Sequence, residues 1–249
     1  MKNTGFYAII LAAGKGKRMR DENAPVEFPK VLRQAAGRPL IAYVIDTLSN
    51  AGIADINIIV GFGADYVKSA LGSSYRYILQ NEQLGSGHAV LSAKDELGER
   101  LGAAIIMCGD SPLFTPATII SLKERHLSSG AAITLVSAEL NDPAGYGRIK
   151  RLASGEITGV VEEKCATVEE KLIHEINGGA YAFDSKWLWE NIGCMERNEA
   201  GELNLTDLVR VAIAQKKKVE AVIVPAEEVM GANTPSDLRV IEDILETRK

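Results

Sequence analysis

The chain has 249 residues, enough for one large α/β domain or two small ones, and its 46% hydrophobic and 24% charged residues are ordinary for a globular protein. A formal net charge of -5 excludes a protein that coats nucleic acid, because that role needs a basic surface to displace counterions. Three widely spaced cysteines, no signal sequence and no apolar run near the roughly 18 residues of a membrane span indicate a cytoplasmic protein without a membrane partner.

The first predicted element is a strand over residues 6–13, whose apolar sequence is typical of a strand buried on both faces. It runs into Gly14 and Gly16, which allow the backbone to approach a ligand closely. The cations around these glycines are Lys15, Lys17, Arg18, Arg20 and Lys30. Open backbone N–H groups beside cations suit a polyphosphate, and the spacing matches neither a P-loop nor a dinucleotide-binding loop. We interpret the loop as a triphosphate site; the alternative is a glycine turn before a solvated basic stretch.

Strands and helices alternate from this loop to residue 138. Short apolar runs predict strands over residues 56–60, 75–79, 103–107 and 132–138. Helical spacing and end signals predict helices over residues 39–51, 64–71, 88–97 and 115–129. This order predicts an α/β fold, a Rossmann-like three-layer sandwich with a mostly parallel sheet and right-handed crossovers.

The alternation breaks near Asn141, where a proline and two glycines interrupt it. Predicted strands of the second half cover residues 148–151, 157–162, 176–183 and 219–225. Its predicted helices cover residues 167–173, 185–192, 205–214 and 235–247, and Leu205-Thr206-Asp207 is expected to cap the third. Because no linker interrupts the chain, we expect one domain, 1–249, whose second half adds a smaller lobe over the sheet edge. Ligand should lie where loops leave the carboxyl ends of the strands.

A polar stretch after the strand at 75–79 places Gln80 and Gln83 beside Gly85 and Ser86. A glutamine side chain both donates and accepts hydrogen bonds, as the imide edge of a pyrimidine requires, and Gly85 permits close approach to a flat base. These residues therefore suggest a nucleotide base site. The alternative is a polar loop before a helix that starts at Ser86.

Asp110 follows an apolar strand and Gly109, where α/β sheets place catalytic carboxylates. With a triphosphate nearby, its carboxylate would bind Mg²⁺, a hard cation that usually takes one or two protein oxygens plus phosphate and water. Asn233 offers a neutral oxygen as a second ligand. A turn aspartate and a helix-start asparagine are the alternative interpretations.

Several motifs follow one another in a consistent order along the chain. They are Leu11-Ala12-Ala13-Gly14-x-Gly16-x-Arg18-Met19, Pro29-Lys30-Val31-Leu32, Gln80-x-Glu82-Gln83-Leu84-Gly85-x-Gly87-His88-Ala89, Gly109-Asp110-x-Pro112-Leu113, Gly145-Tyr146-Gly147-Arg148-Ile149, Val160-Val161-Glu162-x-Lys164, Glu175-Ile176-Asn177-x-Gly179, Asn204-Leu205-Thr206-Asp207 and Asn233. Together they resemble the sugar-1-phosphate nucleotidyltransferases, most nearly the uridyltransferase domain of the bifunctional N-acetylglucosamine-1-phosphate uridyltransferases. The resemblance spans nearly the whole chain.

This resemblance implies a role for each matching position. The implied nucleotide-binding residues are Leu11, Ala12, Ala13, Gly14, Gly16, Gln80, Gln83, Gly85 and Ser86. Arg18 and Lys30 would be the catalytic cations on the phosphates, and Asp110 and Asn233 would hold Mg²⁺. The implied sugar-binding residues are Gly147, Glu162 and Asn177. Residues 1–138 would then form the nucleotide-binding half and residues 139–249 the sugar-binding and closing half.

The implied reaction is Mg²⁺-dependent transfer of UMP from UTP to N-acetylglucosamine-1-phosphate, which needs no obligate protein partner. Cys108, Cys165 and Gly178 depart from the family's pattern on the sugar side, and the acidic segment 21–27 is longer than expected. These departures leave open another sugar-1-phosphate or other phosphorylated acceptor. A third hypothesis is a catalytically silent nucleotide-sugar sensor. We expect no acetyltransferase domain in this chain, so the resemblance implies no oligomeric state.

Overall fold

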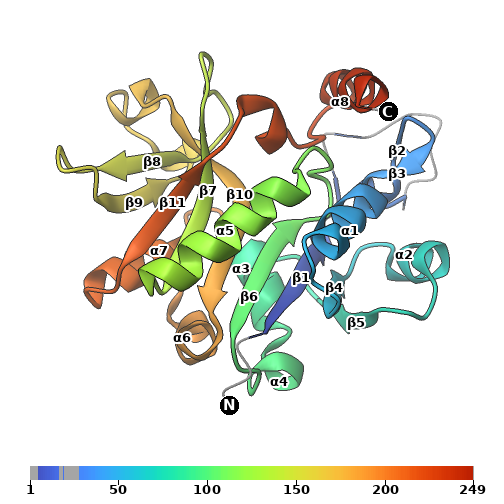
Figure 1. The fold of residues 1–249 in the computed structure, drawn as a ribbon, viewed down its shortest axis with the longest axis horizontal. Helices are drawn as coiled ribbons and strands as arrows, with labels where there is room; N and C mark the ends of the chain where they lie inside the picture. Colours follow the sequence, from blue (N-terminus) through green and yellow to red (C-terminus); the bar gives the residue numbers. More distant parts are fainter. Residues whose placement is uncertain (1–4, 17–18, 20–27, 249) are drawn as a thin grey trace.

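The computed structural model describes residues 5–16, 19 and 28–248, and its centre is a large sheet (Figure 1). The strands run in the order β11-β7-β10-β6-β1-β4-β5, and β8 and β9 attach through β10. Their bounds are β1 Phe6–Ala12, β4 Ile56–Val60, β5 Arg76–Leu79, β6 Ala103–Cys108, β7 Ile133–Glu139, β8 Arg148–Arg151, β9 Ile157–Val161, β10 Glu175–Asp184 and β11 Val219–Ile223. Each strand predicted from the sequence is confirmed.

The sheet is mostly parallel, as predicted. β1 pairs in parallel with β4 and β6, while β4–β5 and β7–β11 are parallel as well. β10 runs antiparallel to both β6 and β7. Because β1 is paired on both edges and covered on both faces, its Ile9 and Ile10 are completely buried, which explains the uninterrupted apolar sequence of this strand.

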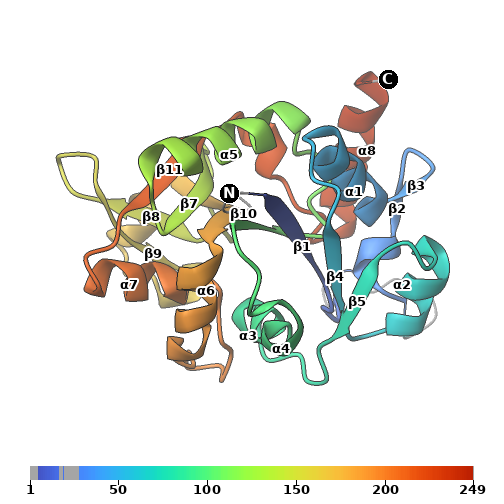
Figure 2. The same cartoon turned by 60° about the horizontal axis from the view of Figure 1, so that its bottom comes forward.

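Helices cover both faces of the sheet and make the predicted three layers (Figure 2). They are α1 Leu40–Asn50, α2 Ala64–Leu71, α3 Ser86–Leu91, α4 Lys94–Leu97, α5 Pro116–Ser129, α6 Ser185–Asn191, α7 Asp207–Ala214 and α8 Pro235–Thr247. Successive residues of β1 pack on opposite faces of the sheet. Ile10 belongs to a core cluster with α1 and α5, and Ile9 belongs to one with α3, α4, α6 and α7. None of the helices in the described part of the chain is both long and apolar enough to cross a membrane.

Two predicted helices are wrong in extent. The helix expected over 88–97 is divided into α3 and α4, because the Ser92 hydroxyl donates to the His88 carbonyl and Ala93 has a ψ of 0°. The helix expected over 167–173 is a single 3₁₀ turn, Glu170–Leu172. Val168 and Leu172 there are largely exposed, so no buried face stabilises a longer helix.

Several short elements were not predicted. β2 Gln34–Ala35 and β3 Arg38–Pro39 form a small hairpin around Gly37, which has a positive φ. The further 3₁₀ turns are Lys30–Leu32, Glu163–Cys165, Ile192–Cys194 and Ala226–Val229. The first of these turns holds Lys30 close to the carboxyl end of the sheet.

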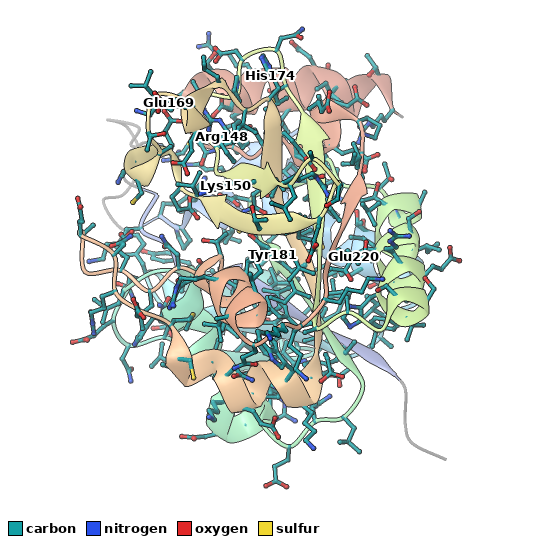
Figure 3. The ribbon with its side chains drawn as sticks, turned by 90° about the vertical axis from the view of Figure 1, so that its left-hand side faces the viewer. Arg148, Lys150, Glu169, His174, Tyr181 and Glu220 are labelled. Carbon is teal, nitrogen blue, oxygen red and sulfur yellow. The ribbon has the colours of Figure 1, made fainter. Side chains whose placement is uncertain are left out.

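The smaller lobe is the antiparallel pair β8–β9, which joins the main sheet where Arg148 pairs with Ile176 of β10. Figure 3 views it with Arg148 and Lys150 labelled on β8. The Arg148 guanidinium is buried and forms a 2.8 Å ion pair with Glu163, while Arg151 of the same strand pairs with Glu175 at 2.6 Å. These ion pairs fasten the lobe to the segments beside it.

Candidate active site

A cavity of about 410 Å³ opens at the carboxyl ends of β1, β5 and β6. Eight of the predicted nucleotide-binding residues line it: Leu11, Ala13, Gly14, Gly16, Gln80, Gln83, Gly85 and Ser86. Lys30 and Asp110 line it too, together with Lys15 of the predicted phosphate loop and with Val31, Ala89, Cys108 and Glu202, which are not among the predicted site residues. The fold thus brings the first loop, the Gln80 loop, Lys30 and Asp110 to one cavity, as expected for the carboxyl edge of a parallel sheet, whereas Asn233 does not line it.

Two predicted residues are placed elsewhere or not described. The Ala12 side chain is buried in the core cluster shared with α1, because successive side chains of a strand point to opposite faces. A ligand in the cavity would therefore meet only the backbone of Ala12. Arg18 lies outside the described residues, as does the 21–27 segment.

Gly16 creates the room that Lys30 needs beside the first loop. Its φ is +56°, and a methyl group built on it would lie 2.9 Å from Lys30 Cβ. A side chain at this position would strain the backbone and displace the lysine. Glycine at position 16 lets the first loop pack closely against the segment that contains Lys30. Both Lys15 and Lys30 line the cavity.

Lys30 lies between the two predicted metal ligands. Its Nζ forms an ion pair with Asp110 Oδ2 and donates a hydrogen bond to Asn233 Oδ1 at 3.0 Å. Asp110 is held in the turn after β6, where its carbonyl accepts from the Ala232 N–H at 3.0 Å. We call Lys30, Asp110 and Asn233 the lysine cluster; its members come from positions 30, 110 and 233 and meet only in the fold.

The lysine cluster fits the chemistry of a hard divalent cation. A carboxylate and a carboxamide oxygen already converge on one positive charge, the Lys30 ammonium. Mg²⁺ commonly takes one or two such oxygens and completes its shell with phosphate oxygens and water. The described residues contain no group of three or more His, Cys, Asp or Glu side chains able to hold a metal. Asp110 and Asn233 offer two such oxygens, and their role as Mg²⁺ ligands stays a prediction.

Gln80 presents one polar atom to the cavity. Its Nε2 group donates to the Gly85 carbonyl at 3.2 Å and lies 3.0 Å from His88 Nδ1, so both N–H groups have partners. Gln83 Nε2 donates to the Gln80 carbonyl at 3.2 Å and braces the same loop. Gln80 Oε1 accepts no hydrogen bond from a described residue, and it can accept the N–H of a pyrimidine imide.

Residues 195–206, the clasp segment, lie against the Gln80 loop. The Leu203 N–H donates to the Leu84 carbonyl and the Gly87 N–H donates to the Leu203 carbonyl, both at 2.8 Å. A methyl group on Gly85 would collide with the Leu203 carbonyl oxygen, and Gly85 has a φ of +107°. Gly85 is predicted to permit close approach to a base; in the fold this glycine also leaves space for the clasp segment.

The three predicted sugar-binding residues also meet in space, and we call Gly147, Glu162 and Asn177 the lobe cluster. The Asn177 N–H donates to the Gly147 carbonyl at 2.8 Å. A methyl group built on Gly147 would lie 3.5 Å from Glu162 Oε2. The lobe cluster does not line the 410 Å³ cavity; it forms a separate group just before β8, just after β9 and on β10.

Side chains outside the predicted set hold the lobe cluster in place. Thr206 Oγ1 donates to Glu162 Oε1 at 2.6 Å, and Asn177 Nδ2 donates to the Tyr181 hydroxyl at 2.6 Å. Thr206 is the N-cap residue of α7, as predicted, but its hydroxyl makes no capping bond and donates to Glu162 instead. Nothing in the local sequence indicates these contacts of Thr206 and Tyr181.

Cys108 is unsuited to act as a nucleophile, although it lines the cavity. Burial raises the pKa of its thiol to about 12, and the charge of Asp110 acts in the same direction. The thiolate, which is the reactive form, is therefore scarce at neutral pH. The cavity therefore presents cations and backbone groups to a ligand, and Cys108 contributes a small uncharged side chain to its wall.

These features define the class of protein. A mostly parallel α/β sheet with glycine-lined and cation-bearing loops at its carboxyl edge, and a small antiparallel lobe beside it, is the nucleotide-diphospho-sugar transferase fold. The chain belongs to the nucleotidyl transferase family, whose model matches residues 7–228.

Curated relatives and a solved structure support this assignment. The chain is 42% identical over 229 residues to the bifunctional protein GlmU of Exiguobacterium sibiricum, and that match covers 91% of this chain and 50% of the relative. It is 42% identical over 244 residues to the bifunctional protein GlmU of Halalkalibacterium halodurans, covering 97% and 52%. The chain thus spans about half the length of these relatives. A crystal structure from Bacillus anthracis described as a glucose-1-phosphate thymidylyltransferase is similar in fold, with a TM-score of 0.79 at 21% identity, covering 96% of this chain and 95% of that one.

Proposed function

We propose that the protein transfers UMP from UTP to N-acetylglucosamine-1-phosphate, with Mg²⁺, to give UDP-N-acetylglucosamine and pyrophosphate. The observation that carries the proposal is the lysine cluster at a glycine-lined cavity: Lys30 and Asp110 line the cavity with Gly14 and Gly16, and Lys30 Nζ also contacts Asn233. Positive charge, two metal-binding oxygens and open backbone are what transfer between two phosphates requires.

The two substrates take opposite sides of the site in this proposal. The triphosphate of UTP lies along residues 14–16 and against Lys30, and its uracil imide N–H meets Gln80 Oε1. The acceptor sugar lies against the lobe cluster, Gly147, Glu162 and Asn177. Residues 1–138 thus form the nucleotide half and residues 139–249 the acceptor half of one domain, and Arg18 joins Lys30 on the phosphates.

The chemistry is a displacement at phosphorus. An oxygen of the sugar phosphate attacks the α-phosphorus of UTP, and the bond from that phosphorus to the bridging oxygen of the β-phosphate breaks, so that pyrophosphate leaves. Since the attacking oxygen is already an anion, the chain has no proton to remove and needs no general base.

The main obstacle is repulsion between two anions, and the chain's cations reduce it. Two unit charges about 4 Å apart repel by roughly 4 kcal/mol at an effective dielectric of 20. Lys30 positions its ammonium where this charge accumulates, and Asp110 and Asn233 would hold Mg²⁺ there. When bound, Mg²⁺ supplies further neutralisation of the phosphate oxygens.

The relatives support this assignment for the part of the sequence that they share. Two of them bear the name bifunctional protein GlmU, and the shared region covers about half of each. The motifs that resemble the uridyltransferases contribute the lysine cluster, the Gln80 loop and the lobe cluster. The proposal concerns nucleotidyl transfer alone.

Pyrophosphate release by the purified chain with Mg²⁺ tests the proposal. Each common nucleoside triphosphate, including dTTP, is paired with N-acetylglucosamine-1-phosphate, glucose-1-phosphate and a few other acceptors. We expect release with UTP and N-acetylglucosamine-1-phosphate and little with other pairs. Release with UTP and another acceptor would overturn the sugar assignment, release only with dTTP would overturn the base assignment, and no release with any pair would favour the silent sensor.

A further inference from the structure

Tyr181 lies next to the lobe cluster and contacts one of its members directly. It follows Asn177 by four residues on β10, where the register with β7 shifts between these two residues. Asn177 pairs with Ser137 before the shift and Tyr181 with Leu135 after it, so four residues of β10 oppose two of β7. The excursion at Gly178 and Gly179 draws the phenol to within 2.6 Å of the Asn177 carboxamide.

The Asn177 carboxamide is held by two hydrogen bonds. Its Nδ2 donates to the Tyr181 hydroxyl at 2.6 Å, while its Oδ1 accepts from the Gly179 N–H at 3.4 Å. The Gly179 N–H can only donate, so it requires the oxygen end of the carboxamide, whereas the phenol can meet either end. The contact with Tyr181 is the shorter of the two and restrains the carboxamide in the orientation that the Gly179 N–H selects.

The phenol is buried beside the lobe cluster. Only 6% of Tyr181 is exposed, and Figure 3 labels it below the β8–β9 pair. Burial raises the pKa of its hydroxyl, against the effect of the hydrogen bond from Asn177, and the charge of Glu162 raises that pKa further. The hydroxyl therefore stays protonated at neutral pH.

We propose that Tyr181 is a positioning residue for the acceptor: it fixes the Asn177 carboxamide so that one N–H and one oxygen lone pair are presented to the sugar phosphate. This inference rests on the proposed function, because it assigns Asn177 to the acceptor. Tyr181 itself touches no substrate. Its loss should weaken acceptor binding and leave the nucleotide side unchanged, since no hydrogen bond or ion pair joins Tyr181 to Lys30, Asp110 or the Gln80 loop within the described part of the chain.

The test is a set of initial-rate measurements on Tyr181→Phe, with pyrophosphate release as the signal. A lost hydrogen bond of ordinary strength, about 1 kcal/mol, corresponds to a KM for the acceptor about three- to tenfold higher. We expect kcat and the KM for UTP to stay within about twofold. An unchanged acceptor KM, or an equal rise in both KM values, would overturn the assignment.

Tyr7→Phe is the matched control. The Tyr7 hydroxyl is also buried and accepts from Ser185 Oγ and Trp189 Nε1, both at 2.9 Å. Removal of this hydroxyl should lower the thermal unfolding midpoint as much as Tyr181→Phe does, without changing either KM. If both variants raised the acceptor KM equally, the effect of Tyr181 would be general destabilisation, and the inference would fail.

A double-mutant cycle makes the coupling specific. In an Asn177→Ala background, Tyr181→Phe should have no further effect on the acceptor KM, because the group that Tyr181 orients is gone. Additive effects would contradict the inference. Side-chain amide hydrogen exchange gives a readout that needs no turnover: the Asn177 carboxamide should exchange faster in Tyr181→Phe, and equal rates would also overturn the inference.

The outcomes separate this inference from the proposed function. Failure of the proposed function appears in the wild-type protein, as no release with UTP and N-acetylglucosamine-1-phosphate. Failure of the inference appears in the variants of an active wild-type protein.

Discussion

The cavity and the lobe cluster are built in different ways. The cavity wall comes from residues that directly follow parallel strands, such as Gly14 after β1, Gln80 after β5 and Asp110 after β6. The lobe cluster comes from the ends of β8 and β9 and from β10, and its Glu162 and Asn177 side chains are hydrogen-bonded to Thr206 and Tyr181. In the proposed function the main sheet forms the nucleotide side, whereas the acceptor side depends on hydrogen bonds between side chains.

This difference suggests that the two regions have separate roles. A parallel sheet can hold the charged groups that every nucleotidyl transfer requires. An attached lobe, held by a few polar contacts, can change its acceptor without disturbing that chemistry. If so, changes at the two regions should have separable effects on the rate and on acceptor binding.

The largest expected effect is that of Lys30→Met on turnover. The variant keeps the length of the side chain and removes the charge between Asp110 and Asn233, so kcat should fall by about 10²- to 10³-fold, the usual cost of a preorganised electrostatic group. Pyrophosphate release measures the loss, and thermal unfolding should show a small change in the midpoint. Lys123→Met is the control, because Lys123 donates to the Ala51 carbonyl at 2.7 Å away from the cavity. A Lys30 variant with wild-type turnover would remove the lysine cluster from the mechanism.

The second-largest expected effect is that of Gly147→Ala on the KM for the acceptor. The added methyl group would meet Val160 and Glu162 at 3.4 and 3.5 Å, ordinary contact distances, so the fold should tolerate it. It would occupy space at the lobe cluster and raise the acceptor KM about tenfold, the scale of one misplaced methylene in a binding pocket. Gly159→Ala in the same lobe is the control, since its methyl group would meet only Lys150 at 4.0 Å. Equal KM values for the two variants would contradict the placement of the acceptor.

A smaller effect is expected from Thr206→Val. The substitution keeps the shape of the side chain and removes the hydroxyl that donates to Glu162 Oε1. One charge-assisted hydrogen bond is worth about 1.5 to 3 kcal/mol, part of which solvent restores at this half-buried site, so the acceptor KM should rise about five- to tenfold. The KM for UTP is the internal reference. A parallel rise in that value would mean that the clasp segment acts on the Gln80 loop and not on Glu162.

The smallest effect is an acid sensitivity confined to the lobe. Hydrogen bonding from Arg148 lowers the pKa of Glu163 below its ordinary 4.5, and the bonds from Arg151 and Ser137 outweigh burial and lower that of Glu175. A carboxyl group with a lowered folded pKa stabilises the protein above its unfolded pKa, and this stability is lost as the pH falls through the folded value.

Native-state hydrogen exchange between pH 6 and pH 3 measures this sensitivity. After correction for intrinsic exchange rates, β8 and β9 should open at a higher pH than β1 and β4. Simultaneous opening of both regions would show that the lobe and the sheet form one cooperative unit, which would contradict their separate roles.

The sequence predicts the sheet well because its strands are buried and apolar. The apolar run from Phe6 to Ala12 clearly predicts a buried strand, and the glycines and cations that follow it predict a phosphate site. The one segment predicted as a helix without a buried face is not an α-helix in the fold. The 167–173 segment has the composition of a helix, yet Val168 and Leu172 pack against nothing that would stabilise one.

Two of the contacts that shape the site could not be predicted, because they join residues far apart in sequence. Thr206 and Glu162 are separated by 44 positions, and Lys30 and Asn233 by 203. Local patterns reveal the residue types that suit a ligand, and the resemblance assigns them to a site. Only the fold shows that Thr206 donates to a carboxylate, or that Gly85 admits the clasp segment as well as a base.

The most direct test compares two properties of the Asn177→Ala variant: its Kd for UTP, measured by calorimetry with Mg²⁺ present, and its KM for the acceptor. We predict a Kd for UTP equal to that of the wild-type protein within about twofold and an acceptor KM raised about tenfold or more, the scale of a lost polar contact to substrate. A Kd for UTP that rises in step with the acceptor KM would contradict the central claim that the sheet holds the nucleotide and the lobe holds the acceptor.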